Sequence, residues 1–596
     1  MKKIVLTIAG LLSVLLAFAD KVDRRQAQTI AQKWLGAEVT ETSYGSDAFY
    51  IFNGADGGWV IISAEDAATP VLGYSDTGSL NPNAMPENFH HWIGGYEKVI
   101  AGARSEKVRA TAEVRALWKN AGARTKATSQ KVIDTPIWGQ EGITDDSTTP
   151  YYNYFCPEVV EGSNTRTSVT GCVATAMAEV IRYHQWPEHG TGTIGGYTYK
   201  SDYNKNVEIP SYNIDSHIYN YNLMPFEPQE AGTSYQYERD AIAQLMHDCG
   251  VMVEAMYNNQ TGTGAYSENI ANALINHMSY SPKANLIYRQ AYSDAEWTRI
   301  IEKEIDADRP IIYAGNDSKN GGHQFVCDGY DTRDYIHINW GWLGDGNGFF
   351  TLSLKIPGEI EGSYIYSFSE FQSMVIGLEP NKSGETAQIA GPLIYDLSDT
   401  KSPGLTLKSG SVLGKSFSLK AEGVFNCNYY ITYDGALKAA LVDWKGDVKE
   451  YISNEVDLQL EGYNITSLDN LQCTISGDVT FGDRVALYYK THDGNWEMVK
   501  GKEAYDNSDK AYYVKESIPA VDGAFILIPE GLKAGDTFFF ELVPGSLPVK
   551  AITWYYDGAK QAGITANLTA GTHAIAADVT FSDGSKEKIT AKIIVK

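Results

Sequence analysis

The chain has 596 residues, a length that predicts three or four domains, and its formal net charge is −25 at pH 7. Such an acidic excess excludes nucleic-acid binding as the main function, because that binding depends on basic patches. The 39 tyrosines and 12 tryptophans supply apolar surface for several cores, so the composition is typical of a folded, exported protein.

The first 19 residues have the pattern of a secretory signal peptide. Lys2 and Lys3 precede an apolar stretch that ends in the small-x-small pattern Ala17-Phe18-Ala19. We therefore expect a mature start near Asp20 and a protein that is secreted, periplasmic or held at the cell surface. The apolar stretch is too short for a membrane anchor, and no later stretch of the sequence approaches the length of a membrane span.

Residues 20 to about 130 form a first α+β unit that ends in a linker. Periodicity predicts a helix over 24–35, strands near 48–52, 59–63 and 71–74, and a helical region over 89–116. The stretch 121–130 is small, polar and basic, which is typical of an exposed linker that proteases cut. A compact unit before such a linker suggests a pro-segment, and an ordinary N-terminal domain on a tether is the alternative.

Residues 131 to about 382 form a second unit, in which helices come first and strands follow. The expected helices begin at Cys172 and cover 237–251, 267–278 and 294–306, and the expected strands cover 310–314, 323–327, 335–339 and 348–352. This order predicts a segregated α+β domain rather than a doubly wound sheet.

From about residue 385 onward, short alternating strands separated by Gly, Asp and Asn turns replace the helical patterns. We expect one β-sandwich over 385–518 and a second, immunoglobulin-like sandwich over 519–596. Neither shows a set of residues suited to catalysis. We expect these domains to bind a cell-surface or host-protein ligand, or to space or present the unit before them.

Six cysteines lie at positions 156, 172, 249, 327, 427 and 473. None forms a CxxC pair, so we expect no zinc site, and nothing else in the sequence calls for a metal or a cofactor. Cys427 and Cys473 fall in the same predicted sandwich. The sequence leaves open whether they form a disulfide or are two buried thiols.

Cys172 is the candidate nucleophile. It follows Thr170-Gly171 and starts a stretch whose apolar residues recur at helical spacing, so it lies in the first turn of a helix. Unpaired N–H groups and the helix dipole stabilise a thiolate there. A small buried cysteine that packs the helix is the alternative.

A thiolate nucleophile needs a base within hydrogen-bonding reach. His184 lies on the same helix about 18 Å away by helical rise, so it is excluded. His323 follows Asn320-Gly321-Gly322 and opens a strand, whereas His337 lies in mid-strand. The residues alone favour His323 and leave His337 open.

Three further residues are candidates for supporting roles. The Asn339 amide could accept the Nδ1 proton of the base, and Trp340 could shield that bond from water. A strand end that packs its aromatic residues explains the same sequence equally well. Gln140 could donate to the oxyanion together with the Cys172 N–H.

Four motifs resemble the streptopain family of bacterial papain-fold cysteine peptidases. They are TGCVATAMAEVIRYH at 170–184, GGHQFVCDGY at 321–330, HINWGW at 337–342, and Gln140 followed by PYYN at 150–153. The resemblance covers 131–382 and implies an α+β papain-like domain with Cys172, His323, Asn339 and Gln140 in its active site. It also implies that 20–130 is an inhibitory propeptide. A tryptophan follows Asn339 directly, unlike papain's Asn-Ser-Trp, so Trp340 enters the site as a further candidate. The β-rich tail lies outside the resemblance and is similar to appendages on exported proteins of Bacteroidota-type bacteria.

The sequence therefore predicts a secreted cysteine endopeptidase made as a zymogen, with proteins or peptides as substrates and its own propeptide as inhibitor. Two rival functions remain. The papain-like fold could serve an amidase or transferase, or the chain could be a surface adhesin whose peptidase domain is vestigial. The intact set Cys172, His323, Asn339 and Gln140 argues against the adhesin.

Overall fold

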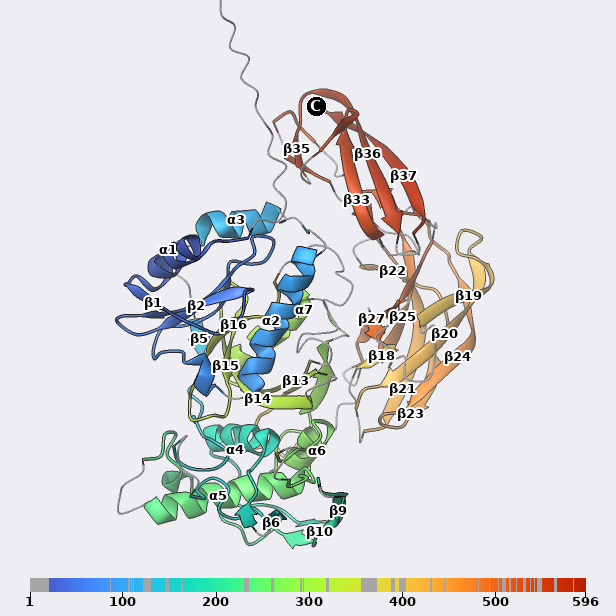
Figure 1. Ribbon diagram of the computed structural model, residues 1–596. Helices are drawn as coiled ribbons and strands as arrows, with labels where there is room; N and C mark the ends of the chain where they lie inside the picture. Colours follow the sequence, from blue (N-terminus) through green and yellow to red (C-terminus); the bar gives the residue numbers. More distant parts are fainter. Residues whose placement is uncertain are drawn as a thin grey trace, which may run out of the picture.

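The computed structural model describes residues 21–596 apart from short gaps, of which the longest are 122–129, 355–371 and 396–403 (Figure 1). The expected signal peptide 1–19 and nearly all of the expected linker 121–130 lie outside the described residues. Among the described residues, no helix is long and apolar enough to cross a membrane.

The first unit contains the expected helix and strands. Its elements are α1 (Arg24–Leu35), β1 (Val39–Thr42), β2 (Phe49–Gly54), β3 (Trp59–Ser63), β4 (Val71–Ser75), η1 (Pro82–Ala84), α2 (Glu87–Ser105) and α3 (Ala112–Asn120). Asp23 caps α1 by accepting from the Gln26 N–H at 2.8 Å, and Gly36 ends the helix at a φ of 67°. The helical region expected over 89–116 is two helices, because the Val108 N–H turns back to the Ala103 carbonyl and closes α2.

The second unit places its helices before the consecutive strands at its end, and several short strands come earlier. Its elements are β5 (Gln130–Val132), β6 (Glu158–Glu161), β7 (Asn164–Thr167), α4 (Cys172–His184), β8 (Thr193–Ile194), β9 (Tyr197–Lys200), β10 (Asn206–Ile209), β11 (Tyr212–Asn213), η2 (Tyr221–Leu223), α5 (Tyr235–Met252), α6 (Glu268–His277), β12 (Asn285–Tyr288), α7 (Asp294–Asp306), β13 (Ile311–Asp317), β14 (Gly321–Asp331), β15 (Tyr335–Asn339), β16 (Gly348–Thr351) and β17 (Ser373–Ile376). The segregated α+β arrangement is confirmed.

One antiparallel sheet joins the two units. Its strand order is β1-β2-β3-β4-β16-β15-β14-β13-β17-β12, with β5 paired to β14. The junction is the pairing of β4 with β16, in which Gly73 lies opposite Phe350. A Cβ at Gly73 would lie 2.8 Å from the Phe350 ring, so glycine is what permits this close approach.

The joined sheet has a different helical layer on each face. Helices α2 and α7 pack on one face, where Phe89, Trp92 and Trp297 share a core with Phe325 and Phe350. Helices α4, α5 and α6 form the layer on the other face, around Val326 and Ile312 (Figure 1). The strand β14 runs between these two cores, since its alternate residues point to opposite faces.

The remainder of the chain is all-β, as expected. The first sandwich packs a sheet of β18 (Leu393–Tyr395), β19 (Gly404–Ser411), β20 (Ser416–Asn426) and β24 (Ile465–Thr474) against one of β21 (Tyr433–Val442), β22 (Val448–Tyr451), β23 (Val456–Leu460), β25 (Arg484–Lys490), β26 (Trp496–Met498) and β29 (Ser517–Pro519). The hairpin of β27 (Glu503–Tyr505) and β28 (Ala511–Tyr513) lies between β26 and β29 in the sequence.

The last part has a core of its own. Its elements are β30 (Phe525–Ile526), β31 (Thr537–Phe539), β32 (Leu542–Val543), β33 (Val549–Tyr556), β34 (Ala559–Lys560), β35 (Thr565–Asn567), β36 (Gly571–Phe581) and β37 (Lys586–Val595). Ala520 belongs to the core of the first sandwich, whereas Ala524 belongs to that of the last part. All six cysteines are free thiols, so Cys427 and Cys473 are two buried thiols rather than a disulfide.

Candidate active site

Cys172 is the first residue of α4, as predicted. Gly171 precedes it at a φ of 84°, and a Cβ there would lie 2.6 Å from the Thr263 carbonyl oxygen. Only glycine therefore fits this turn without strain. The Gly171 carbonyl accepts from the N–H and the hydroxyl of Thr175 at 3.1 and 3.0 Å, which fixes the turn to the helix that it starts.

The Cys172 thiol is half-buried, whereas the other five cysteines are buried. Burial raises the pKa of the Cys172 thiol, while the N–H groups of Gln324, Val173 and Cys172 itself lower it. The N–H groups at the helix end therefore act in the predicted direction on the pKa of the thiol, and in this state of the protein burial outweighs them. The contribution from Gln324 shows that the thiol lies beside β14, next to His323.

His323 shares the α2 face of β14 with Phe325. The His323 ring lies 4.9 Å from the His91 ring of α2, and Phe325 packs on Trp92 of the same helix at 5.8 Å. Burial first, and the neighbouring His91 second, lower the pKa of His323 from 6.5 to about 4. His323 is therefore a neutral imidazole at physiological pH, and α2 covers it.

His337, the rival base, lies elsewhere. It is paired in register with Gly329, six residues beyond His323 along β14, which is about 20 Å at the usual rise of a strand. Its Nδ1 is 2.5 Å from an Asp328 carboxyl oxygen, and its ring packs on Phe349. His337 therefore belongs to a pair at the far end of the strand.

Gln140 is attached to the turn that presents Cys172. Its carbonyl accepts from the Thr170 N–H at 3.1 Å, two residues before the cysteine. The Trp138 carbonyl, two residues before Gln140, accepts from the Leu343 N–H at 3.0 Å. The structure thus brings the segment of Gln140 together with both the start of α4 and the turn that follows Asn339.

Asn339 is buried, and both ends of its amide are engaged. Its Nδ2 donates to the Pro136 carbonyl at 2.7 Å and to the Thr135 hydroxyl at 3.2 Å. Its Oδ1 accepts from Asn347 Nδ2 at 3.1 Å and from the Gly341 N–H at 3.2 Å. In this state the amide secures its own turn to the segment that leads to Gln140.

Trp340 is fully buried under α2. Its ring packs on Trp92 and Phe89, and its carbonyl accepts from Asn88 Nδ2 at 3.1 Å. The indole N–H donates to the Gly346 carbonyl at 3.0 Å. The strand end therefore packs its aromatic residues, as one of the two descriptions made from the sequence had it, and the shielding of a bond between Asn339 and the base stays a prediction.

Two residues of this region were missed by reasoning from the sequence. His91 contacts His323 from a helix of another unit, and no local sequence pattern predicts such a contact. Glu179 is fully buried and accepts from the Trp138 N–H at 3.1 Å. Its signal was available, because a lone carboxyl seven residues after Cys172 lies on the same face of an otherwise apolar helix. No group of three or more metal-ligating side chains occurs in the part of the chain that the structure describes.

Comparisons with known proteins find several relatives of this chain. Residues 147–350 match the description "Peptidase C10 family", and residues 19–100 match "Spi protease inhibitor". The chain is 31% identical over 359 residues to streptopain of Streptococcus pyogenes, covering 58% of this chain and 83% of streptopain. It is 30% identical over 348 residues to the thiol protease/hemagglutinin PrtT of Porphyromonas gingivalis, covering 58% of this chain and 38% of that protein. A prointerpain A fragment of Prevotella intermedia is 29% identical, with a TM-score of 0.45 over 57% of this chain and 98% of the fragment.

Proposed function

We propose that Cys172 is the nucleophile and His323 the base of this enzyme. The chain belongs to the peptidase C10 family, so it is a cysteine peptidase made as a zymogen. The observation that carries this assignment is the position of Cys172 at the start of α4, beside the Gln324 N–H and hence next to His323. His337 is held by Asp328 about 20 Å along the strand, which argues against it as the base.

The chemistry follows from these positions. Once uncovered, His323 takes the Cys172 proton, and the thiolate attacks the carbonyl carbon of the scissile peptide bond. The oxyanion that forms accepts from the Cys172 N–H and the Gln140 amide. His323 then gives its proton to the leaving amine, and water hydrolyses the thioester. Asn339 and Trp340 hold the turn beside the base, and the orienting contact from Asn339 to His323 stays a prediction for the active form.

The first unit is the inhibitory propeptide, and its α2 keeps the enzyme latent. We infer that latency has two parts, since α2 covers the His323 ring with His91 and burial keeps the Cys172 thiol protonated. Removal of α2 exposes the His323 ring to water and to substrate. Cleavage in the expected linker 121–130 would release it, so we propose that the mature peptidase begins near residue 131.

The remaining proposals concern the whole chain. We propose export by the signal peptide 1–19, an endopeptidase that acts on proteins, a peptidase domain over 131–382, and sandwiches over 385–518 and 519–596. The two sandwiches would bind a cell-surface or host-protein ligand. Support for this role is the absence of any proposed catalytic residue after Trp340.

The decisive experiment compares the full-length protein with Cys172→Ala. We expect the wild type to shorten itself and to cleave a fluorogenic peptide, and the variant to fold, stay full-length and show no hydrolysis. After removal of the propeptide, iodoacetamide should label Cys172 before the five buried cysteines. Labelling of all six cysteines at the same rate would contradict an activated thiolate.

A further inference from the structure

Glu179 has no role in the reaction as proposed, yet it lies buried on the helix that presents Cys172. It is seven residues after Cys172 on α4, which places it two turns along the helix and on the same face. Its side chain is fully buried. In the part of the chain that the structure describes, no Lys or Arg pairs with its carboxyl, so it is a buried acid without a compensating cation.

The contacts of Glu179 join three segments. Its Oε1 accepts from the Trp138 N–H, two residues before Gln140. The Asn339 amide, which donates to Pro136, lies near enough to lower the pKa of the Glu179 carboxyl. One turn nearer Cys172, Thr175 bonds the Thr170 hydroxyl at 2.8 Å. One face of α4 thus contacts the oxyanion segment and the Asn339 turn, and it presents the nucleophile.

Glu179 is suited to this position as a neutral acid. Burial raises its pKa well above the usual range, and the nearby Asp328 raises it further, while the Trp138 N–H and Asn339 lower it. A buried carboxylic acid costs free energy that a leucine of similar volume would not. The hydrogen bond to the Trp138 N–H is what leucine could not supply.

We propose that Glu179 is a positioning residue that fastens the segment of Gln140 to the helix of Cys172, so that both donors to the oxyanion keep their spacing. This inference rests on the proposed function, in which Gln140 and the Cys172 N–H bind the oxyanion. Glu179 does not touch the substrate, and it acts through Trp138 and Gln140. Its loss should therefore weaken binding of the tetrahedral state and leave the reactivity of the thiol intact.

The test uses the full chain after removal of its propeptide by added wild-type enzyme. The variants are Glu179→Leu, which cannot accept a hydrogen bond, and Glu179→Gln, which accepts through its amide oxygen and cannot ionise. Val180→Ala is the matched control, because Val180 is the next residue of the same helix and is buried in its core. Affinity for a peptide aldehyde reports the oxyanion site, since the aldehyde forms a tetrahedral adduct with the thiol. The rate of alkylation by iodoacetamide reports the thiol alone.

We expect Glu179→Leu to lose about 10- to 100-fold in kcat and in aldehyde affinity, with KM and the alkylation rate within about threefold of wild type. Glu179→Gln should keep aldehyde affinity within about threefold. Val180→Ala should lower the melting temperature without changing aldehyde affinity. Wild-type aldehyde affinity in Glu179→Leu would overturn the inference, and so would a loss in Glu179→Gln as large as that in the leucine variant.

Two further variants complete the design. If Glu179→Leu does not fold, Glu179→Asp decides, because it keeps the acid but is one methylene too short to reach the Trp138 N–H. It should lose at least about tenfold in aldehyde affinity, and wild-type affinity would overturn the inference. Gln140→Ala separates this inference from the proposed function. If Gln140→Ala leaves the aldehyde affinity unchanged, the oxyanion assignment itself is wrong. If Gln140→Ala lowers the affinity and the Glu179 variants leave it unchanged, only the inference about Glu179 fails.

Discussion

The peptidase domain is bordered by two other parts of the chain, and they contact it in different ways. The propeptide extends its sheet through β4 and β16 and lays α2 over His323 and Trp340. The first sandwich stands beside the domain (Figure 1) and contacts residues of α6, α7 and β12. Its contacts include Asn428 Nδ2 to Asn285 Oδ1 at 3.1 Å, the pair Lys500–Glu296, and an apolar cluster of Ile394, Phe425 and Cys427 with Tyr288 and Tyr292.

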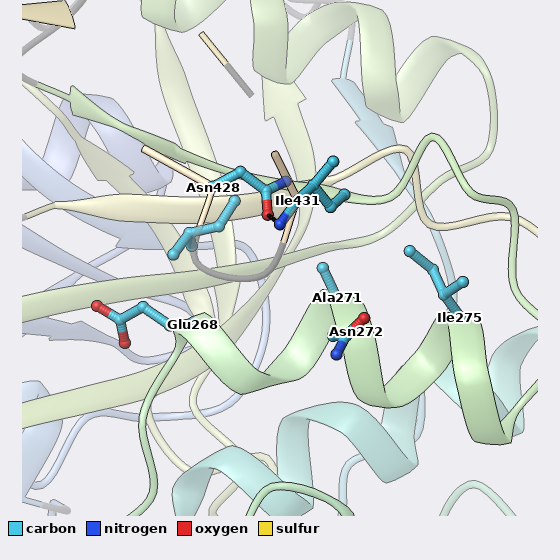
Figure 2. Close-up of a pocket in the computed structure, with 7 residues that line it drawn as sticks. Glu268, Ala271, Asn272, Ile275, Asn428 and Ile431 are labelled. Atoms are coloured by element: carbon cyan, nitrogen blue, oxygen red, sulfur yellow. Dashed lines mark hydrogen bonds between the residues drawn. The ribbon is translucent and has the colours of Figure 1, made fainter. Parts of the chain in front are cut away.

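The packing differs as well. The propeptide buries large aromatic side chains such as Trp59, Tyr74 and Trp92 fully or nearly so. At the sandwich contact a pocket lies between α6 and the Asn428 loop, lined by Glu268, Ala271, Asn272, Ile275, Leu286, Asn428 and Ile431 (Figure 2). The propeptide contact, which contains the candidate base, is the one that activation must break.

The largest effect should follow changes to the base that the propeptide covers. His323→Ala should reduce peptide hydrolysis by about 10³-fold or more, because the thiol then lacks its base, with little change in melting temperature. His337→Ala should instead lower the melting temperature, because it leaves the Asp328 carboxyl without that partner, and should keep most of the activity. Steady-state kinetics and thermal melts of both variants measure this. An inactive but well-folded His337→Ala protein would reverse the assignment.

The second prediction concerns the pH dependence of propeptide binding. Covered His323 has a pKa of about 4, below its ordinary value of 6.5, so the uncovered form binds more protons between these two pH values. Affinity for a separate propeptide, residues 20–120, should therefore be greatest above pH 6.5. It should fall by up to about tenfold per unit from pH 6.5 to pH 4 and level off below.

Calorimetry on mature Cys172→Ala protein measures that affinity without proteolysis. Replacement of His323 by Asn in the same background is the control, since it removes the titrating group and should flatten the profile over this range. A profile that keeps its full slope in the His323→Asn protein would place the effect on another group.

The sequence predicted the helix that begins at Cys172 and the strand that contains His323, because these depend on local patterns of spacing. It could not predict that β4 pairs with β16, because strand pairing between units is decided by shapes such as the fit of Gly73 against Phe350. Spacing likewise could not predict that burial raises the pKa of the Cys172 thiol in this state. The N–H groups that lower this pKa belong to the local helix end, whereas burial depends on the tertiary packing around the thiol.

The third prediction tests the second attachment of the propeptide, away from His323. Tyr74 donates to the buried Asp331 at 2.7 Å and accepts from Arg333 at 3.0 Å, while the Arg333 guanidinium lies 4.5 Å from the Trp34 ring. Tyr74→Phe should weaken inhibition by the separate propeptide about tenfold, because it leaves these buried charges short of a partner. Tyr50→Phe is the matched control, since its hydroxyl donates to Val22 within the propeptide and should affect inhibition by less than about twofold. The measurement is the inhibition constant of each propeptide variant in a peptide-hydrolysis assay. Equal losses of inhibition in Tyr74→Phe and Tyr50→Phe would mean that the assay reports only the stability of the propeptide.

The smallest effect on chemistry should come from removal of both sandwiches. A chain that stops at Asn381 keeps β17 and the bond from the Asn381 N–H to the Ser279 carbonyl, so the peptidase sheet stays complete. It exposes Asn285, Tyr288 and Tyr292, and we expect a melting temperature a few degrees lower for that reason. Turnover of a small peptide should remain within about threefold, because none of the proposed catalytic residues contacts the sandwich through a described bond.

One path could make this prediction fail. Tyr288, which packs on the sandwich, donates to Glu268 at 3.2 Å, and the adjacent Ser267 donates to Gln324 beside His323 at 3.0 Å. The measurement is kcat/KM on a fluorogenic peptide for both lengths, together with Tyr288→Phe in the full-length enzyme. A loss of more than about tenfold on truncation, or roughly 1.4 kcal/mol in barrier, would mean that the sandwich supports the active site. If Tyr288→Phe reproduced that loss, the support would run through α6; if it did not, the support would come from the apolar cluster.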